Sequence, residues 1–435
     1  MTRSEVVRFA GLYFPLAAAC IAGVLKRGRP RLFVACLLSA LWTAPSLLLV
    51  QKLNVVYGWW TFRDAEVWFS GMPLELYLGW VIAWGIAAPI ALGRLPLWMS
   101  IFWMALLDFA VMPFCEPAVN LEPRWVLGEC VSLLAVLLPA LCIARLTLQN
   151  RCLRLRAWMQ IAISGGVFLL LVPEIVFSAS TGSGWAPLLE TRGWERQIAV
   201  QLMVLITLPG IGSVMEFAER GGGTPIPYDP PTRLVTSGMY RYCANPMQLC
   251  CTLVLAAWAA LLENSWLLLV PALSAVYSAG VARWDEGEDM ERRFGQAWRS
   301  YRAEVRDWIP RWRPFHAGAS ARLYVAASCA PCSEVWRWIT ARMPIGLEIV
   351  PAESLPTGSI RRMRYVPEDG SRPVEGVRAL GRALEHLNLG WAIAGNALRM
   401  PGVWQFAQIV MDASGLGPQA PKGAAMHCAT GSSEG

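Results

Sequence analysis

Polar residues that could bind a charged cofactor stand together in one loop of the chain. Tyr240, Arg241 and Tyr242 form a run, and Asn245-Pro246 follows at the start of an apolar stretch. A guanidinium group can hold a carboxylate through two parallel hydrogen bonds, and tyrosine rings offer faces to a sulfonium or an adenine. Because Asn is a favoured helix cap and Pro is favoured in a first helical turn, we expect a membrane helix to begin here.

Acidic residues follow after two further apolar runs. Glu286 and Glu288 could accept hydrogen bonds from ribose hydroxyls or from an amino group. The loop, the apolar hairpin and the acidic helix would together enclose a cytoplasmic site for a nucleotide-like cofactor. The alternative is that Arg241 anchors the chain at the membrane surface and that the acidic helix is solvated.

The segment Gly223–Arg311 resembles the C-terminal part of the isoprenylcysteine carboxyl methyltransferase and phospholipid methyltransferase group of membrane enzymes. That group has a Ser-Gly-Pro-Tyr-Arg-Tyr lead, a His/Asn-Pro-x-Tyr start to a helical hairpin, a Glu-rich stretch, Phe-Gly and a closing Trp-Ile-Pro-Arg. The residues in register are Tyr240, Arg241, Tyr242, Asn245, Pro246, Glu286, Phe294, Gly295, Tyr301 and Pro310. The resemblance implies an S-adenosylmethionine site, with Arg241 and Glu286 as catalytic residues. The implied cofactor-binding residues are Tyr240, Arg241, Tyr242, Asn245, Pro246, Glu286 and Glu288.

Four positions depart from that pattern. Met239 stands where Pro is usual, Ala244 where Arg is common and Gln248 where Tyr is expected, and Gly287 interrupts a frequent Glu-Glu pair. The fold should tolerate these changes better than the activity does. Methyl transfer from a sulfonium depends on alignment of the reacting atoms and on desolvation of the cofactor. We therefore expect no metal site, and the three His residues all lie in the last third of the chain.

A second pair of candidate catalytic residues is Cys329 and Cys332, between an expected strand, Leu323–Ala327, and an expected helix, Ser333–Met343. A second expected strand, Gly346–Val350, completes the start of a βαβ-like unit. A thiolate at a helix N-terminus is stabilised by the helix dipole and by free N–H groups, and this arrangement is typical of thioredoxin-like redox domains. Cys329 would be the nucleophile and Cys332 the resolving thiol, with a possible thiol redox partner. A zinc site would need a second cysteine pair, and two unreactive thiols are the remaining alternative.

The region Leu323–Gly415 also resembles the small thiol-oxidoreductase family named for its Asp-Cys-Cys signature. The stretches Gly390-Trp391-Ala392 and Arg399-Met400-Pro401-Gly402-Val403 are similar to that family's tail. The family's Asp is absent, because Ala327 and Ser328 occupy the positions before the first Cys.

The composition indicates that most of the chain lies in a membrane. Of its 435 residues, 55% are apolar and only 16% are charged, against about 25% charged in soluble proteins. Nine apolar runs approach the ~20 residues that a membrane span needs. They are Val7–Leu25, Leu32–Val50, Leu74–Leu92, Leu95–Phe114, Val126–Ala144, Trp158–Ala179, Ile198–Met215, Met247–Leu262 and Trp266–Ala282.

The positions of the basic residues predict the orientation, because Lys and Arg accumulate in cytoplasmic loops. The loops Lys26–Arg31 and Arg145–Arg156 each contain four basic residues. With nine spans these loops share one face, which predicts an outside N-terminus and a cytoplasmic C-terminus, in what we take to be a bacterial inner membrane. The net charge of +7 therefore reflects membrane topology, and we expect no nucleic-acid partner.

We accordingly expect an α-helical polytopic membrane protein of about nine spans with a small C-terminal α/β thioredoxin-like cytoplasmic domain. The expected parts are a six-span membrane domain at 1–196, a methyltransferase-like membrane domain at 197–315, a Cys-x-x-Cys domain at 320–415 and a disordered tail at 416–435. The leading hypothesis is an S-adenosylmethionine-dependent methyltransferase acting on a lipid, isoprenoid or small hydrophobic acceptor, fused to a thiol–disulfide domain. The alternative is a membrane-anchored thiol–disulfide oxidoreductase.

Three acids lie in or beside the first six spans, namely Glu75, Asp108 and Glu174, and carboxylates inside a membrane are costly and usually functional. Glu75 belongs to the run Gly71–Trp80, which resembles carotenoid-modifying membrane proteins such as the lycopene cyclase group. That resemblance implies protonation of an isoprenoid double bond as a further alternative. Interface placement of Glu75 and interhelical hydrogen bonding of Asp108 are the simpler interpretations.

Overall fold

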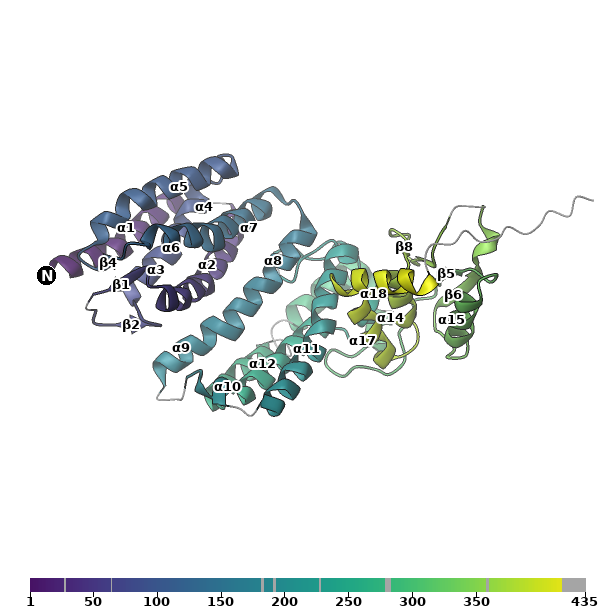
Figure 1. The fold of residues 1–435 in the computed structure, drawn as a ribbon. Coiled ribbons are helices and arrows are strands. Elements are labelled where there is room, and N and C mark those ends of the chain that lie inside the picture. Colours follow the sequence, from purple (N-terminus) through teal and green to yellow (C-terminus); the bar gives the residue numbers. More distant parts are fainter. Residues whose placement is uncertain are drawn as a thin grey trace, which may run out of the picture. The chain divides into compact units, whose positions relative to one another are not determined.

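The computed structural model describes residues 1–26, 29–63, 65–180, 184–190, 193–226, 228–277, 283–356 and 360–416, without the side chains of 277, 283–286 and 415–416. The described chain is mostly helical (Figure 1). It divides into two compact units, which are described separately. The first holds Met1–Val200, Gly222–Pro231 and Leu255–Leu273, and the second holds Gln201–Gly221, Thr232–Val254 and Ser274–Gly435.

The first unit is a bundle of long apolar helices. Its helices are α1 (Arg3–Leu25), α2 (Pro30–Tyr57), α3 (Leu74–Ile82), α4 (Ala88–Leu92), α5 (Leu97–Val111), α6 (Trp125–Ser132), α7 (Leu138–Gln149), α8 (Leu153–Gly166), α9 (Val172–Ala179) and α10 (Ala186–Glu190). The helix α2 packs against α7, and α1 packs against α3. The α1–α3 contact is close, because a methyl group on Gly79 would lie 2.2 Å from the carbonyl oxygen of Gly11.

Three of the long spans contain a π-helical turn that ends two residues before a proline. These turns are η1 (Ala83–Ala87) before Pro89, η3 (Leu133–Leu137) before Pro139 and η4 (Val167–Leu171) before Pro173. Proline has no N–H to donate, and its ring clashes with the carbonyl of the preceding turn. The backbone widens to a π-turn at that place, and α3, α6 and α8 thereby continue into α4, α7 and α9.

Two short antiparallel pairs connect the helices at one end of this bundle. The strand β1 (Trp60–Phe62) pairs with β4 (Val119–Leu121), and β2 (Trp68–Phe69) pairs with β3 (Met72–Pro73). The pairs lie in the loops from α2 to α3 and from the 3-10 turn η2 (Met112–Cys115) to α6. The strands β1 and β2 contain the aromatic residues Trp60, Phe62, Trp68 and Phe69.

Seven described helices are long and apolar enough to cross a membrane. They cover Arg3–Leu25, Pro30–Tyr57, Leu74–Leu92, Leu97–Cys115, Trp125–Gln149, Leu153–Ala179 and Gly193–Gly221, and they correspond to the first seven predicted spans. The two remaining predicted spans correspond to shorter apolar helices, Pro246–Leu261 and Ser265–Val276. At 1.5 Å per residue these are shorter than a hydrocarbon core of about 30 Å, so the structure supports an integral membrane protein with seven candidate spans, and nine stays a prediction. Residues 278–282, in the expected ninth span, lie outside the described residues.

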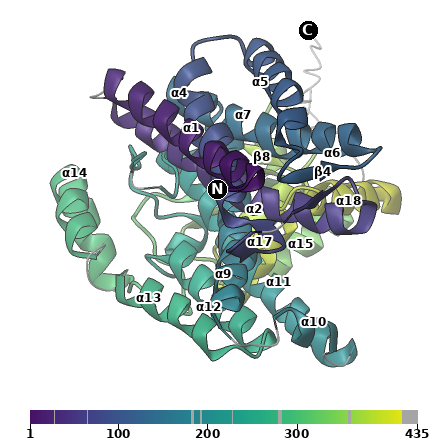
Figure 2. The same ribbon diagram turned by 90° about the vertical axis from the view of Figure 1, so that its left-hand side faces the viewer.

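The second unit begins within α11 (Gly193–Glu216), which continues as the π-turn η5 (Phe217–Gly221). The 3-10 turn η6 (Gly238–Arg241) follows, then α12 (Pro246–Leu261), η7 (Ser265–Leu268), α13 (Leu269–Tyr277) and α14 (Arg283–Glu304), in that order along the chain (Figure 2). Of these elements, the part Leu255–Leu273, from within α12 to within α13, belongs to the first unit. The predicted start of a helix at Pro246 is confirmed. The helix α14 is kinked at Gly295, whose φ of 51° lies in the left-handed region that favours glycine.

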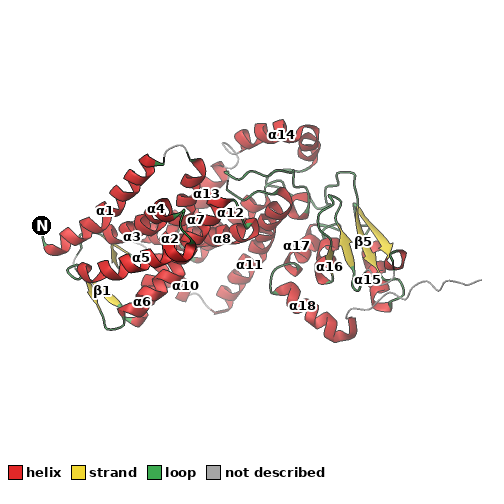
Figure 3. Cartoon of the chain, turned by 90° about the horizontal axis from the view of Figure 1, so that it is seen from above, coloured by secondary structure: helices red, strands yellow, loops and turns green. Residues whose placement is uncertain are grey.

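The C-terminal region contains the larger sheet, with helices beside it (Figure 3). Its strands are β5 (Ala321–Val325), β6 (Leu347–Pro351), β7 (Arg364–Val366) and β8 (Val374–Glu375), in the spatial order β6-β5-β7-β8. The strand β5 is parallel to β6 and antiparallel to β7, and β7 is antiparallel to β8. The helices are α15 (Ala330–Thr340), α16 (Val377–Leu384), α17 (Leu389–Leu398) and α18 (Val403–Met411).

The predicted strand–helix–strand order after residue 320 is therefore confirmed, with each element displaced by one to three residues. The crossover through α15 joins two parallel strands, as a βαβ unit requires. The core of this region is formed by β5, α15 and α16, with Leu323, Ile339 and Ala383 almost fully buried. Residues 417–435, which form nearly all of the predicted tail, lie outside the described residues.

Candidate functional site

The loop predicted to bind a cofactor is held against a segment that lies about 60 residues later in the chain. The backbone N–H of Ala244 donates to the carbonyl of Arg306, and the N–H of Arg311 donates to the carbonyl of Tyr242, both at 2.9 Å. The N–H of Phe315 donates to the carbonyl of Arg241 at 2.8 Å. The two ends of the predicted motif thus lie side by side, although the hairpin and α14 separate them in the sequence.

Side chains of the same loop also make buried hydrogen bonds. The hydroxyl of Tyr301 donates to the carbonyl of Tyr240 at 2.8 Å, and the hydroxyl of Tyr242 donates to the carbonyl of Glu385 at 2.9 Å. Burial raises the pKa of Tyr242 and of Tyr301. Both phenols are therefore neutral donors over the physiological range, and Tyr242 connects the loop to the C-terminal region.

Asn245 and its neighbour fix the start of α12. The Asn245 Nδ2 atom donates to Oδ1 of Asp307 at 3.2 Å, and the Cys243 thiol contacts the carbonyl of Asp307 at 2.9 Å. Burial raises the pKa of Cys243 to about 11. Pro246 is the first residue of the helix. These residues position the backbone of the loop, and Cys243 is not a nucleophile at neutral pH.

Arg241 is 3% exposed, and its guanidinium group is occupied within the protein. Nη1 donates to the carbonyl of Phe315 at 3.2 Å, and Nη2 pairs with the carboxylate of Glu368. The hydroxyl of Tyr365 donates to the other carboxylate oxygen of Glu368 at 3.3 Å. Arg241 therefore binds a carboxylate through Nη2 alone, and this carboxylate belongs to a C-terminal side chain, so the predicted cofactor role of Arg241 stays a prediction.

Buried His386 is joined to this chain of contacts through Tyr365. Its Nε2 lies 2.9 Å from the Tyr365 hydroxyl, and its Nδ1 lies 2.8 Å from the carbonyl of Ile345. Burial and the nearby Arg241 charge lower the pKa of His386 well below its ordinary value. The imidazole is therefore neutral and donates to only one of these two oxygen atoms.

The predicted acidic residues are not brought to the loop by any contact that the described part of the chain contains. Glu288 is exposed on α14, and no hydrogen bond or ion pair within the described residues joins it to Tyr240–Asn245. The side chain of Glu286 lies outside the described residues. The cofactor roles of Glu286 and Glu288 stay predictions.

A buried ion cluster that sequence reasoning missed lies next to Ser237, shortly before the Tyr240–Asn245 loop in the chain. The carboxylate of Glu216, 2% exposed at the end of α11, is contacted by three arginines and by the hydroxyl of Ser237. The arginines are Arg220 at 2.9 Å, Arg382 at 2.7 Å and Arg399 at 3.5 Å. Glu385 also pairs with Arg382 and Arg399 at 3.2 and 2.7 Å. The one signal in the sequence was a single carboxylate at the end of an otherwise apolar run.

The Cys329-Ala330-Pro331-Cys332 segment begins α15, with Cys329 at the N-cap position and Pro331 in the first turn. The two sulfur atoms lie 2.6 Å apart, and both side chains are partly exposed. Burial and a hydrogen bond with Cys329 raise the pKa of Cys332 to about 12. A thiol with a raised pKa suits the resolving role predicted for Cys332.

A carboxylate does lie near the cysteines, although it follows β6 in the sequence. Glu353 accepts hydrogen bonds from the N–H groups of Ala327 and Ser328 at 3.2 and 2.9 Å and from the Ser328 hydroxyl at 2.8 Å. Partial burial opposes ionisation, but these hydrogen bonds lower the pKa of Glu353 to about 2. The loop before Cys329 is therefore fixed by an ionised side chain that sequence reasoning missed.

The acids of the first unit occupy different surroundings. Glu174 accepts from Trp185 Nε1 at 2.8 Å and lies 3.6 Å from Lys52, which gives it a structural partner. Asp108 lies beside Glu129, a residue that sequence reasoning did not select. No group of three or more His, Cys, Asp or Glu side chains suited to a metal ion is found within the described ranges.

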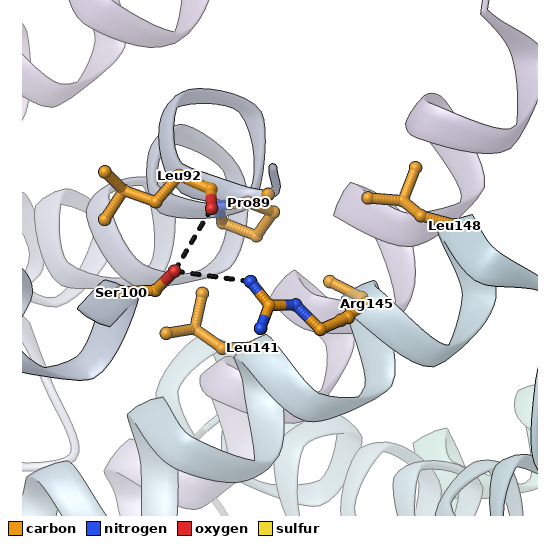
Figure 4. A pocket seen from close by; sticks show the side chains of 8 residues that line it. Pro89, Leu92, Ser100, Leu141, Arg145 and Leu148 are labelled. Atoms are coloured by element: carbon orange, nitrogen blue, oxygen red, sulfur yellow. Dashed lines mark hydrogen bonds between the residues drawn. The ribbon is translucent and has the colours of Figure 1, made fainter. Parts of the chain in front are cut away.

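A small pocket of the first unit lies between α4, α5 and α7 (Figure 4). Arg145 points into it and donates to the Ser100 hydroxyl at 3.5 Å, and that hydroxyl donates to the carbonyl of Leu92 at 3.1 Å. The other lining side chains are apolar, and none is acidic. The pocket therefore offers no acid–base pair.

Comparison with known proteins supports the interpretation of the segment that contains the Tyr240–Asn245 loop. The chain matches no curated protein and no solved structure. The sequence model of the phospholipid methyltransferase family matches residues 198–297, which include most of α11, the Tyr240–Asn245 loop, both helices of the hairpin and most of α14. This stretch is thus similar to the phospholipid methyltransferases, and the match supports a membrane methyltransferase of that type.

Proposed function

We propose that the protein is an integral membrane methyltransferase that uses S-adenosylmethionine, which supplies the methyl group, to modify a lipid, isoprenoid or small hydrophobic acceptor. The observation that carries the proposal is the family match over residues 198–297, whose central loop holds a buried arginine paired with a carboxylate. A guanidinium that already binds a carboxylate suits the amino-acid end of the cofactor. Because Arg241 binds Glu368, the cofactor would have to displace that side chain.

The roles of the other loop residues follow from their contacts. Tyr242 and Asn245 fix the loop through Glu385 and Asp307, so Arg241 is presented from a rigid backbone. The apolar helices α12 and α13 follow directly and suit an acceptor that enters from the bilayer. Rigid presentation and exclusion of water are the contributions that an in-line transfer requires from a protein.

Binding of S-adenosylmethionine to the full chain in detergent, measured by calorimetry, tests this proposal. Glu368→Gln should raise the affinity, because it removes the carboxylate that competes for Arg241, and Arg241→Ala with Glu286→Ala should lower it. Glu304→Gln, which affects an exposed partner of Arg311, is the matched control and should bind like the wild type. Absence of binding by the wild type would refute the function, and equal affinities in all variants would refute the site.

For the C-terminal region we propose a thioredoxin-like thiol–disulfide activity, and this is also the second candidate for the whole protein. The sheet order β6-β5-β7-β8, in which β5 and β6 are parallel and joined through α15, supports it, as does the position of Cys329 at the N-cap of α15. We further propose that this region is cytoplasmic and that the N-terminus is outside. Measurement of a reversible Cys329–Cys332 disulfide against a glutathione buffer tests the activity, and a pair that never oxidises would exclude it.

A further inference from the structure

The outward side of the helix α18 is apolar. Its large exposed side chains, 43% to 69% exposed, are Val403, Phe406, Ile409 and Val410. Because they lie three or four residues apart, they form a single face of the helix, which we call the outer face of α18. The exposed polar residue of the helix, Gln405, lies near its N-terminal end, where its Oε1 atom accepts from the N–H of Gly402 at 2.6 Å. The proposed methyl transfer and thiol chemistry give this face no role.

The polar side of α18 faces the protein. Gln408 Oε1 accepts from the N–H of Val377 at 3.0 Å, and Gln408 Nε2 donates to Asp412 Oδ1 at 2.8 Å. Asp412, just past the end of the helix, also pairs with Arg362 at 2.6 Å. Gln408 lies so close to Gly376 that a methyl group on this glycine would have no room. These contacts fix the rotation of the helix about its axis, and the outer face is thereby directed away from the residues that hold it.

The helix α15 of the same region has the opposite arrangement. Its exposed residues include Glu334, Arg337 and Thr340, and its buried residue Ile339 lies in the core beside the sheet. Polar side chains outward and apolar side chains inward are typical of a helix beside water. The reversed arrangement of α18 indicates that its outer face lies in apolar surroundings, since a contiguous exposed apolar patch marks a contact site.

The helix α18 begins close to the end of a candidate membrane span. Asn396 on α17 packs against α11 at Gly212, where a methyl group would have no room. Arg399, which follows α17, lies 3.5 Å from Glu216 at the end of α11. Because Gly212 and Glu216 lie at the end of the apolar run Ile198–Met215, α17 contacts the span near the level at which the span leaves the membrane. One short turn leads from there to α18.

The membrane surface suits the outer face better than a protein partner does. The nine residues of α18 extend over about 14 Å, and one face of that length covers far less than the ~500 Å² per partner that a stable dimer interface needs. Residues 417–435 contain one large apolar side chain, Met426, so they are too polar to cover this face. A helix that lies in the membrane interface buries its apolar face about 5–10 Å into the boundary between head groups and acyl chains.

We propose that α18 is an interfacial helix whose outer face lies in the lipid of the membrane in which the protein is embedded. The guanidinium of Arg378 stands 5.6 Å from the centre of the Trp404 ring on α18, so a positive charge beside the helix is available to lipid phosphates. The negative charge of Asp412 is paired with Arg362. The helix would hold the C-terminal region at the membrane surface. This inference is independent of the proposed methyltransferase function, because it needs only an integral membrane protein.

Photolabelling by lipid tests the proposal with the full chain in nanodiscs. Two phosphatidylcholines serve as probes, one with a diazirine next to the ester group of an acyl chain and one with the diazirine at the chain end. Trypsin releases α18 in the peptide Met400–Lys422 and most of α15 in the peptide Leu323–Arg337. The ester-level probe should label residues 403–410 several-fold more than the chain-end probe does, because an interfacial helix does not reach the bilayer centre. Neither probe should label the α15 peptide.

Variants locate the contact. Phe406→Gln combined with Ile409→Gln should abolish labelling of residues 403–410, whereas Met343→Gln, which changes an exposed apolar residue after α15, should leave that labelling unchanged. Thermal unfolding identifies a variant that fails to fold, and the two probes with wild-type protein still decide the question. An unlabelled α18 peptide, equal labelling by both probes, or full labelling of a folded double variant would overturn the proposal. A particle mass of two chains that falls to one chain in the double variant would assign the face to a second copy and would also overturn it.

Discussion

Replacement of Glu216 by Gln should release the C-terminal helices from α11. The carboxylate of Glu216 lies 2.7 to 3.5 Å from Arg220, Arg382 and Arg399. Gln keeps the shape but removes the charge, which leaves three buried or nearly buried guanidinium groups. The remaining acids are Glu385, which pairs with Arg382 and Arg399, and Asp369, which pairs with Arg220. Loss of one partner from a buried ion pair costs about 3–5 kcal/mol, because the other partner stays desolvated.

Hydrogen exchange is the suitable assay, because α16 and α17 can open without unfolding of the membrane helices. A cost of 3–5 kcal/mol corresponds to roughly 100-fold to several-thousand-fold faster exchange of amides in residues 377–398. Glu291→Gln is the matched control, since its pair with Arg299 is about half exposed on both sides and should contribute less than about 1 kcal/mol. Adding Arg382→Met to Glu216→Gln should restore part of the protection. Unchanged exchange in a folded Glu216→Gln protein would contradict this account of the cluster.

Three further predictions concern other parts of the molecule. Cys329→Ser should abolish fast alkylation by iodoacetamide near pH 7, whereas Cys332→Ser should keep the fast alkylation and trap mixed disulfides, because burial raises the pKa of Cys332 to about 12. Equally slow reaction of both thiols would show that the pair is inert. Burial lowers the pKa of His386 below its ordinary 6.5, so below that pH the unfolded chain binds more protons than the folded chain. The free energy of unfolding should therefore fall with decreasing pH by up to about 1.4 kcal/mol per pH unit. Denaturant titrations of the wild type and of His386→Gln should differ in this pH dependence, and identical slopes would exclude the effect. Reporter fusions after Val119 and after Arg156 should give opposite signals, since one long helix separates them, and equal signals would remove a span from the predicted topology.

Local properties of the sequence were sufficient for several of these results. Long apolar runs predicted the seven candidate spans, because a helix in lipid must be apolar over its whole length. The apolar run before Cys329, the helical run after it and the apolar run Gly346–Val350 predicted β5, α15 and β6. The loop Tyr240–Asn245 was selected from side-chain chemistry, and the family match over residues 198–297 covers it. The first hairpin helix, α12, has the predicted length, and residues 278–282 at the end of the second predicted run lie outside the described residues.

The partners of the charged side chains were decided by the tertiary structure. Arg241 binds Glu368, which is 127 residues away, and Glu216 binds Arg382, which is 166 residues away. Asp108 meets Glu129 because α5 and α6 bring them to one place. Apolar periodicity is a property of each segment by itself and can be read from the sequence. Charge pairing depends on which segments pack together, and one carboxylate in an apolar run looks the same whether its partner is a proton, an arginine or a ligand.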